Sequence, residues 1–252
     1  MKRHAFLLIG QSNMAGRGFM HEVEPISDPR LNVLRNGRWL RMYQPVNNDR
    51  SFSGVCLAES FALEYAQEHD VDAVGLIPCA DGGTCLDQWV EGGLLYDHAV
   101  YQCKLAQRTS NIVGVLWHQG EADCAEDRYA LYTEKFTRIM NALRRDLDLE
   151  GIPFLLGGLG SYFETGRYPQ IKLRYLDINR QLEQIAADNP ATGFVSAEGL
   201  GCNPDELHFS AQALREFGQR YYRVFTTLED KTRVFPEKSD MDGAIRSSME
   251  LL

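Results

Sequence analysis

The sequence lacks any apolar run of the roughly 18 residues that a membrane-spanning helix requires. It also lacks an excess of basic residues, because 26 Lys and Arg stand against 35 Asp and Glu, which gives a formal net charge of −9. An acidic chain gains nothing from the phosphate attraction that drives nucleic-acid binding. We therefore expect neither a membrane nor a nucleic acid as a partner.

Motifs for metals and phosphates are missing as well. The six cysteines form no Cys-x-x-Cys pair, and neither His-Glu-x-x-His nor Gly-Lys-Ser/Thr occurs. These are the spacings of zinc ribbons, zinc proteases and P-loops. We therefore expect no metal and no cofactor.

The first nine residues imitate a signal peptide only in part. Basic residues at positions 2–4 precede five apolar residues, but this stretch is short and no small-residue cleavage site follows it. Cleavage there would also remove the motif of residues 10–13, which is discussed below. We expect a cytoplasmic protein, in which reducing conditions keep the cysteines as free thiols.

Short apolar runs alternate along the chain with longer segments of helical periodicity. The runs predicted as strands are residues 6–9, 72–77, 112–117, 153–159 and 193–197. The segments predicted as helices are residues 57–68, 98–107, 128–147, 173–187 and 210–225, the last with Ser210 as N-cap. Within residues 31–45, the pair Asn36-Gly37 predicts a tight hairpin turn.

Strand–helix alternation is typical of a parallel sheet covered by helices on both faces. We expect an α/β fold, namely a flavodoxin-like three-layer α/β/α sandwich with a five-stranded parallel sheet in the order 2-1-3-4-5. Residues 1–236 are expected to form a single domain. The polar residues 237–252 are expected to form a C-terminal extension, either a loose tail or a contact arm.

Polar, glycine-rich segments follow four of the five predicted strands. They are residues 10–16 (GQSNMAG), 79–84 (CADGGT), 118–121 (HQGE) and 205–208 (DELH). The carboxyl ends of parallel strands meet at one edge of a sheet, where ligands bind. We therefore expect the reactive groups of the protein on these loops.

Two of these segments contain the parts of a nucleophilic hydrolase. The Ser12 hydroxyl needs a base, which His208 can supply, and the histidine needs a carboxylate to fix its tautomer. Asp205 lies three residues before His208, a spacing that lets its carboxylate reach Nδ1 while Nε2 faces Ser12. Glu121 is the alternative carboxylate.

A tetrahedral intermediate at Ser12 needs hydrogen-bond donors for its oxyanion. The candidates are the backbone N–H of Ser12, a backbone N–H at Gly82 or Gly83, and the side-chain amide of Gln119. A glycine backbone without Cβ can approach a substrate closely.

The blocks GQSNMAG, ADGGT, LWHQGEAD and DELHF, in this order, resemble those of SGNH hydrolases. They are most similar to the sialate O-acetylesterase and acetyl xylan esterase branch, carbohydrate esterase family six. The resemblance spans about residues 6–225. General SGNH enzymes have an asparagine where this chain has Gln119, which matches the sugar-esterase branch and argues against a generic lipase.

The resemblance implies an SGNH-type esterase domain that uses no metal and hydrolyses acetyl esters on a small sugar or oligosaccharide. It makes Ser12 the nucleophile, His208 the base and Asp205 its acid. It assigns the oxyanion hole to Ser12, Gly83 and Gln119. Gln11 and Glu121 are predicted to contact the substrate or to support the residues that do.

Two other functions stay open. A thioesterase or lysophospholipase could use the same triad, and a non-catalytic sugar-binding protein could share the fold. Trp89 and Trp117 are candidates for a sugar site, with core packing as the default reading. Arg17 either contacts a substrate carboxylate or lies in a solvated loop. The sequence does not reveal the oligomeric state.

Overall fold

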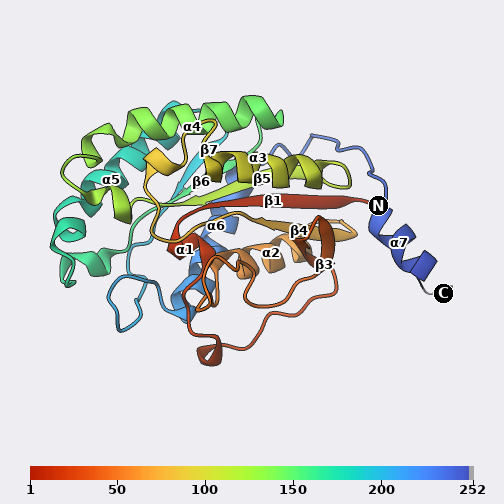
Figure 1. The fold of residues 1–252 in the computed structure, drawn as a ribbon, viewed down its shortest axis with the longest axis horizontal. Coiled ribbons are helices and arrows are strands. Elements are labelled where there is room, and N and C mark those ends of the chain that lie inside the picture. The colour runs from red at the N-terminus through yellow and green to blue at the C-terminus, as the bar shows by residue number, and fades with distance from the viewer. Residues whose placement is uncertain (250–252) are drawn as a thin grey trace.

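The computed structural model describes residues 1–249, and within them a seven-stranded sheet forms the centre of the fold (Figure 1). The strands are β1 Arg3–Gly10, β2 Leu31–Arg35, β3 Arg38–Arg41, β4 Ala73–Pro78, β5 Asn111–His118, β6 Phe154–Gly157 and β7 Thr192–Val195. They lie in the order β3-β2-β4-β1-β5-β6-β7. Neighbouring strands are parallel except β2 and β3, which are antiparallel.

The five strands expected from the sequence are β1, β4, β5, β6 and β7, and they lie in the expected order. The sheet described in residues 1–249 nevertheless has seven strands rather than five, because the hairpin joins it. Asn36 and Gly37 form the turn, with φ angles of 49° and 74°, and β2 pairs with β4, where Leu31 lies opposite Val74. The hairpin thus covers backbone groups of β4 that would otherwise form an open edge. A turn motif predicts a hairpin but not the edge that it joins.

Helices cover both faces of the sheet, as Figure 1 shows. The α-helices are α1 Ser12–Ala15, α2 Leu57–Glu68, α3 Leu94–Gln107, α4 Tyr132–Leu147, α5 Pro169–Asp188, α6 Ala211–Leu228 and α7 Met241–Met249. Short 3₁₀ helices are η1 Met20–Glu22, η2 Leu86–Gln88, η3 Glu121–Cys124, η4 Tyr129–Leu131 and η5 Ser161–Glu164. One face carries α3, α4 and α5, and the other carries α2 and α6.

The central strand β1 divides its side chains between two buried clusters. Ala5, Leu7 and Ile9 pack toward α3, α4 and α5, whereas Phe6 and Leu8 pack toward α2 and α6. This alternation is the two-residue period of a strand. Every residue of β1 is buried, because helices cover both faces of the sheet. The expected three-layer α/β/α sandwich is therefore confirmed.

Most helix boundaries agree with the sequence pattern where a capping signal exists. Helix α2 has the predicted bounds, and the Ser210 hydroxyl accepts a hydrogen bond from the Ala213 N–H at 3.2 Å at the start of α6. Helices α3 and α5 begin four residues earlier than predicted. Neither Gly93 nor Tyr168, the residues before them, offers a side-chain cap. The start of α3 therefore gives little signal in the sequence, whereas Pro169 at the first position of α5 is a start signal that the predicted bounds did not use.

Part of the predicted C-terminal extension lies against the free edge of the sheet. The Asp242 carboxylate of α7 accepts a hydrogen bond from the backbone N–H of Trp39 in β3 at 3.0 Å. The division into a domain of residues 1–236 and an extension of residues 237–252 stays a prediction, and residues 250–252 lie outside the described part. No helix in residues 1–249 combines the length and the apolarity needed to cross a membrane.

Candidate active site

Ser12 lies where β1 turns into the short helix α1, at the carboxyl edge of the sheet. Gly10 ends β1 with a φ of 129°, and a Cβ there would come within 2.1 Å of the His118 carbonyl oxygen. Only glycine fits this close approach of β1 to β5. The Gln11 N–H donates to the same carbonyl at 2.9 Å. Ser12 is then the first residue of α1, where the backbone N–H has no acceptor within the helix.

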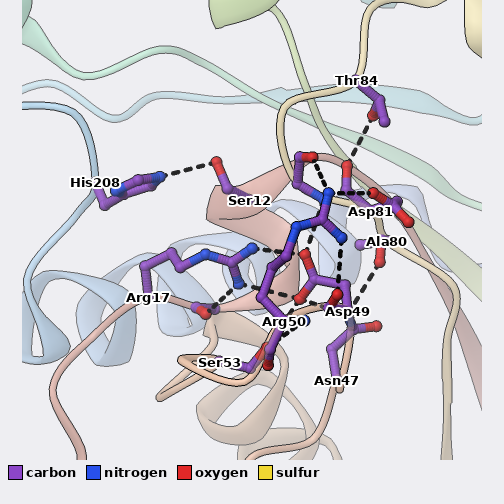
Figure 2. A network of polar contacts seen from close by, with 12 residues as sticks. Ser12, Arg17, Asn47, Asp49, Arg50, Ser53, Ala80, Asp81, Thr84 and His208 are labelled. Atoms are coloured by element: carbon purple, nitrogen blue, oxygen red, sulfur yellow. Dashed lines mark hydrogen bonds and ion pairs between the residues drawn. The ribbon is translucent and has the colours of Figure 1, made fainter.

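The loop after β7 brings His208 to Ser12. Nε2 of His208 lies 3.0 Å from Oγ of Ser12 (Figure 2), and Nδ1 lies 2.7 Å from Oδ2 of Asp205. The other oxygen of Asp205 accepts hydrogen bonds from the N–H groups of Leu207 and His208, at 2.9 and 3.0 Å. These bonds fix the turn, so the three-residue spacing presents a carboxylate to Nδ1.

Hydrogen bonding decides the ionisation of Asp205. Burial by itself would raise the pKa of this carboxyl group. The hydrogen bonds from the side chain of His208 and from two backbone N–H groups outweigh burial and hold the pKa below its usual value. Asp205 is therefore an anion at neutral pH, which favours the tautomer of His208 that is protonated on Nδ1.

Glu121 does not take the place of Asp205. One of its oxygens accepts a hydrogen bond from Nδ2 of Asn13 at 2.5 Å and lies 3.9 Å from Nδ1 of His118. The Asn13 oxygen in turn accepts from the N–H of Phe209 at 3.1 Å. Glu121 thus anchors Asn13, which links α1 to the segment that carries His208. The alternative in which Glu121 serves His208 is not what the structure shows.

The structure does not bring the Gln119 amide to Ser12. This side chain is completely buried, and its Nε2 group donates to the Thr84 carbonyl oxygen at 3.1 Å and to the Asp123 carboxylate. Both amide hydrogens therefore bind protein groups. The prediction that Gln119 donates to an oxyanion is corrected here: it ties β5 to the loop that follows β4.

Gln11 has different surroundings from Gln119. Its side chain lines the cavity at Ser12, and its Oε1 faces the N–H groups of Gly120 and Ala122 at 3.5 and 3.4 Å. Among residues 1–249 no acceptor binds its Nε2 group. The orientation of Oε1 leaves the N–H groups of Gln11 free for a ligand in the cavity.

A buried ion pair supports the glycine loop after β4. Arg17 and Asp49 form two hydrogen bonds, at 3.1 and 2.5 Å, and Asp49 also accepts from the N–H of Gly82 at 2.8 Å (Figure 2). A Cβ on Gly82 would lie 2.5 Å from the Arg17 guanidinium. Gly83, with a φ of 79°, has open space beside it and lines the cavity. Arg17 is therefore buried and paired with Asp49. The prediction that it lies in a solvated loop is wrong.

The cavity over Ser12 has a volume of about 390 Å³. Gln11, Glu121 and His208 lie in its wall together with apolar side chains, namely Ala122, Ile171, Leu207, Phe52 and Tyr168. Neither aromatic residue, Phe52 nor Tyr168, was among the residues predicted for the site. Phe52 is 67% exposed in the loop between β3 and α2, and this exposure has no signal in the sequence.

Trp89 and Trp117 lie elsewhere. Both are completely buried in the core on the α3–α4–α5 face, so neither lines the cavity. Within residues 1–249, no group of three or more His, Cys, Asp or Glu side chains is arranged to hold a metal ion. The chemistry that the cavity offers is that of a hydroxyl, an imidazole, a carboxylate and amide N–H donors.

Comparison with known proteins identifies the family. The model of the carbohydrate esterase, sialic acid-specific acetylesterase family matches residues 2–227. The chain belongs to this carbohydrate esterase family. The family resemblance drawn from the four sequence blocks is thereby confirmed, and the family is one of carbohydrate acetylesterases of the SGNH type.

Individual relatives of this carbohydrate esterase agree with that result. A probable carbohydrate esterase from Arabidopsis thaliana is 29% identical over 238 residues, 84% of this chain and 86% of the relative. Its crystal structure superposes with a TM-score of 0.79 at 25% identity, over 89% of this chain and 98% of that one. The structure of NanS has a TM-score of 0.72 at 18% identity, over 90% and 97% of the two chains, and shows likeness of fold.

Proposed function

We propose that this protein is a serine acetylesterase that removes acetyl groups from a small sugar or an oligosaccharide, with Ser12, His208 and Asp205 as its triad. The observation that carries the proposal is the continuous contact from hydroxyl to imidazole to carboxylate, at 3.0 and 2.7 Å. Membership of a carbohydrate acetylesterase family supports the type of substrate.

In the proposed reaction, Nε2 of His208 takes the proton of Ser12 as Oγ attacks the acetyl carbonyl carbon. The anionic Asp205 stabilises the imidazolium that forms. The imidazolium then protonates the sugar oxygen, the ester bond breaks and the deacetylated sugar leaves. His208 next activates a water molecule, which hydrolyses the acetyl-Ser12 ester and releases acetate.

The oxyanion of each tetrahedral intermediate would be held by three donors. They are the backbone N–H of Ser12, the backbone N–H of Gly83 and the side-chain amide of Gln11. The support for Gln11 is its place in the cavity wall and its free N–H groups. Donors fixed in this way by the protein stabilise developing charge without reorganisation.

Activity on a panel of esters tests the proposal. We expect hydrolysis of p-nitrophenyl acetate and of O-acetylated sugars, with O-acetylated sialic acids first among them, and little hydrolysis of p-nitrophenyl octanoate. A preference for the octanoate would favour a thioesterase or lysophospholipase. Binding of sugars without hydrolysis of any ester would favour a non-catalytic sugar-binding protein.

The location of the protein in the cell stays a prediction. We propose a cytoplasmic location, which would make soluble acetylated sugars more accessible substrates than wall polymers. Fractionation of the native cells, with the protein recovered outside the soluble fraction, would contradict it.

A further inference from the structure

A second cavity of about 320 Å³ lies next to the one over Ser12. Its walls come from the end of β2, from residues that follow β4, from the loop that contains Asp49, and from α3. The cavity over Ser12 includes residues that follow β1, β4 and β5. Because β2, β4, β1 and β5 are parallel neighbours, the two cavities lie side by side along the carboxyl edge of the sheet.

The two cavities share a wall. Asp49 lines the second cavity and pairs with Arg17, which lines the first. Arg50 lines the first cavity and pairs with Asp81, which lines the second, at 3.0 Å. Figure 2 shows Asp49, Arg50 and Asp81 next to Ser12, on the side away from His208, with Arg17 reaching toward them from below His208. A ligand that extends from Ser12 across Arg50 therefore reaches the second cavity.

The lining of the second cavity offers hydrogen-bonding groups that the protein itself does not use. Asn36 comes from the β2–β3 turn, and His98 and Gln102 come from successive turns of α3. The side chains of these three residues make no hydrogen bond to any group within residues 1–249. Amides and an imidazole both donate and accept hydrogen bonds, as sugar hydroxyls do.

The remaining walls suit a sugar. Leu34, Pro78 and Leu95 give the cavity an apolar side, which suits the C–H face of a pyranose. The charged groups at the other side all have partners in the protein. Asp49 and Asp81 each bind an arginine, and the Arg35 guanidinium donates to the carbonyl oxygens of Pro45 and Val46. A volume near 300 Å³ is at the lower end of the range for small-molecule sites, roughly 300–1,000 Å³.

We propose that this second cavity is a sugar-binding subsite. It holds the neutral sugar residue that is joined to the acetylated one, while the acetyl group of the latter lies against Ser12. The inference rests on the proposed acetylesterase function and extends it, because it makes an oligosaccharide, not a single sugar, the preferred substrate.

The test compares kcat/KM on pairs of substrates that differ by one neutral sugar. Suitable pairs are an O-acetylated sialic acid with the same acid joined to galactose, and acetylated xylose with acetylated xylobiose. We expect the larger member of at least one pair to be preferred by about tenfold or more, the effect of two additional hydrogen bonds. In His98→Ala/Gln102→Ala the preference should fall by about tenfold, mainly through KM.

The control is Tyr101→Ala/Lys104→Ala, which changes two exposed residues of the same helix outside the cavity and should keep the wild-type preference. Equal kcat/KM values within both pairs, or a preference that survives in His98→Ala/Gln102→Ala, would overturn the subsite. Failure of the proposed function gives a different result, since the wild-type protein would then hydrolyse neither p-nitrophenyl acetate nor any acetylated sugar.

Discussion

The choice between Gln11 and Gln119 as oxyanion donor can be settled with isosteric variants. Gln11→Glu keeps an oxygen that can face Gly120 and Ala122, but it replaces the free N–H groups of the amide by a carboxylate oxygen. Loss of one oxyanion donor lowers kcat by about 10²–10³, or about 2.7–4 kcal/mol, and the added negative charge should increase this loss. Gln11→Ala should give the same range without the added charge.

Thermal stability should respond in the opposite order, with a larger loss in the Gln119 variant than in the Gln11 variants. The contacts of the Gln11 oxygen are long, at 3.4 and 3.5 Å, so its removal should change the melting temperature little. Gln119→Ala leaves the buried Thr84 carbonyl oxygen without this donor, and Oδ2 of Asp123 keeps only the hydrogen bond from the Leu86 N–H. An unsatisfied buried group costs about 1–3 kcal/mol. At about 2–4 °C per kcal/mol for a protein of this size, several degrees of Tm should be lost.

The assay is kcat on p-nitrophenyl acetate, measured beside a thermal melt for each variant. The expected pattern is an inactive but stable Gln11→Glu and a destabilised Gln119→Ala whose folded fraction keeps more than a tenth of the activity. Gln119 and not Gln11 is the oxyanion donor if kcat falls by about 10²-fold or more in folded Gln119→Ala while Gln11→Ala remains near the wild-type rate.

Other predictions follow from the same geometry. Ser12→Ala should lower kcat on the order of 10⁶-fold with an unchanged melt, and an organophosphonate should label Ser12; a variant that keeps a tenth of the rate would contradict its role. Asp205→Asn should lower kcat about 10³–10⁴-fold, and Glu121→Gln should lower it clearly less. Steady-state kinetics on the two variants measure this order, and the reverse order would contradict the assignment of Asp205 as the triad acid. Because Arg17 and Asp49 are both nearly completely buried, Asp49→Asn should cost about 3–5 kcal/mol in urea unfolding at pH 7. Burial by itself would raise the pKa of Asp49, but the hydrogen bonds from Arg17 outweigh burial and lower it. The stability that the ion pair contributes is therefore present above the usual Asp pKa of about 3.9. It is lost as the pH falls through the lower pKa of Asp49 in the folded protein. Asp49→Asn has no carboxylate to protonate at this position, so its free energy of unfolding should not show this loss at low pH. If the free energy of unfolding falls with pH as it does in the wild type, the ion pair does not stabilise the fold.

Local sequence features predicted the parts of the site that depend on neighbours along the chain. The spacing of Asp205 and His208 is enough to predict their contact, because the turn needs only the backbone N–H groups of residues 207 and 208 to form. The strand ends were also visible, since β1 and β5 are nearly continuous apolar runs. Together they predicted which loops meet at Ser12.

The two glutamines show where that reasoning stopped. Gln11 and Gln119 both follow buried strands, and both are amides beside a proposed reactive residue. Which one faces the cavity depends on acceptors from distant loops, the Thr84 carbonyl oxygen and the Asp123 carboxylate, which bind Gln119 and leave Gln11 free. No periodicity in the sequence records those contacts.

By itself, the sequence determined the alternation of strands and helices, the four reactive segments and the pairing of Asp205 with His208, because these depend on hydrophobic period and short-range spacing. Tertiary structure alone decided that the β2–β3 hairpin extends the sheet beside β4, that Phe52 and Tyr168 rather than two tryptophans line the cavity, and that Arg17 is neutralised by Asp49. The physical reason is that edge pairing, burial and ion pairing are set by the residues a segment meets in space, and these lie tens of positions away in the chain.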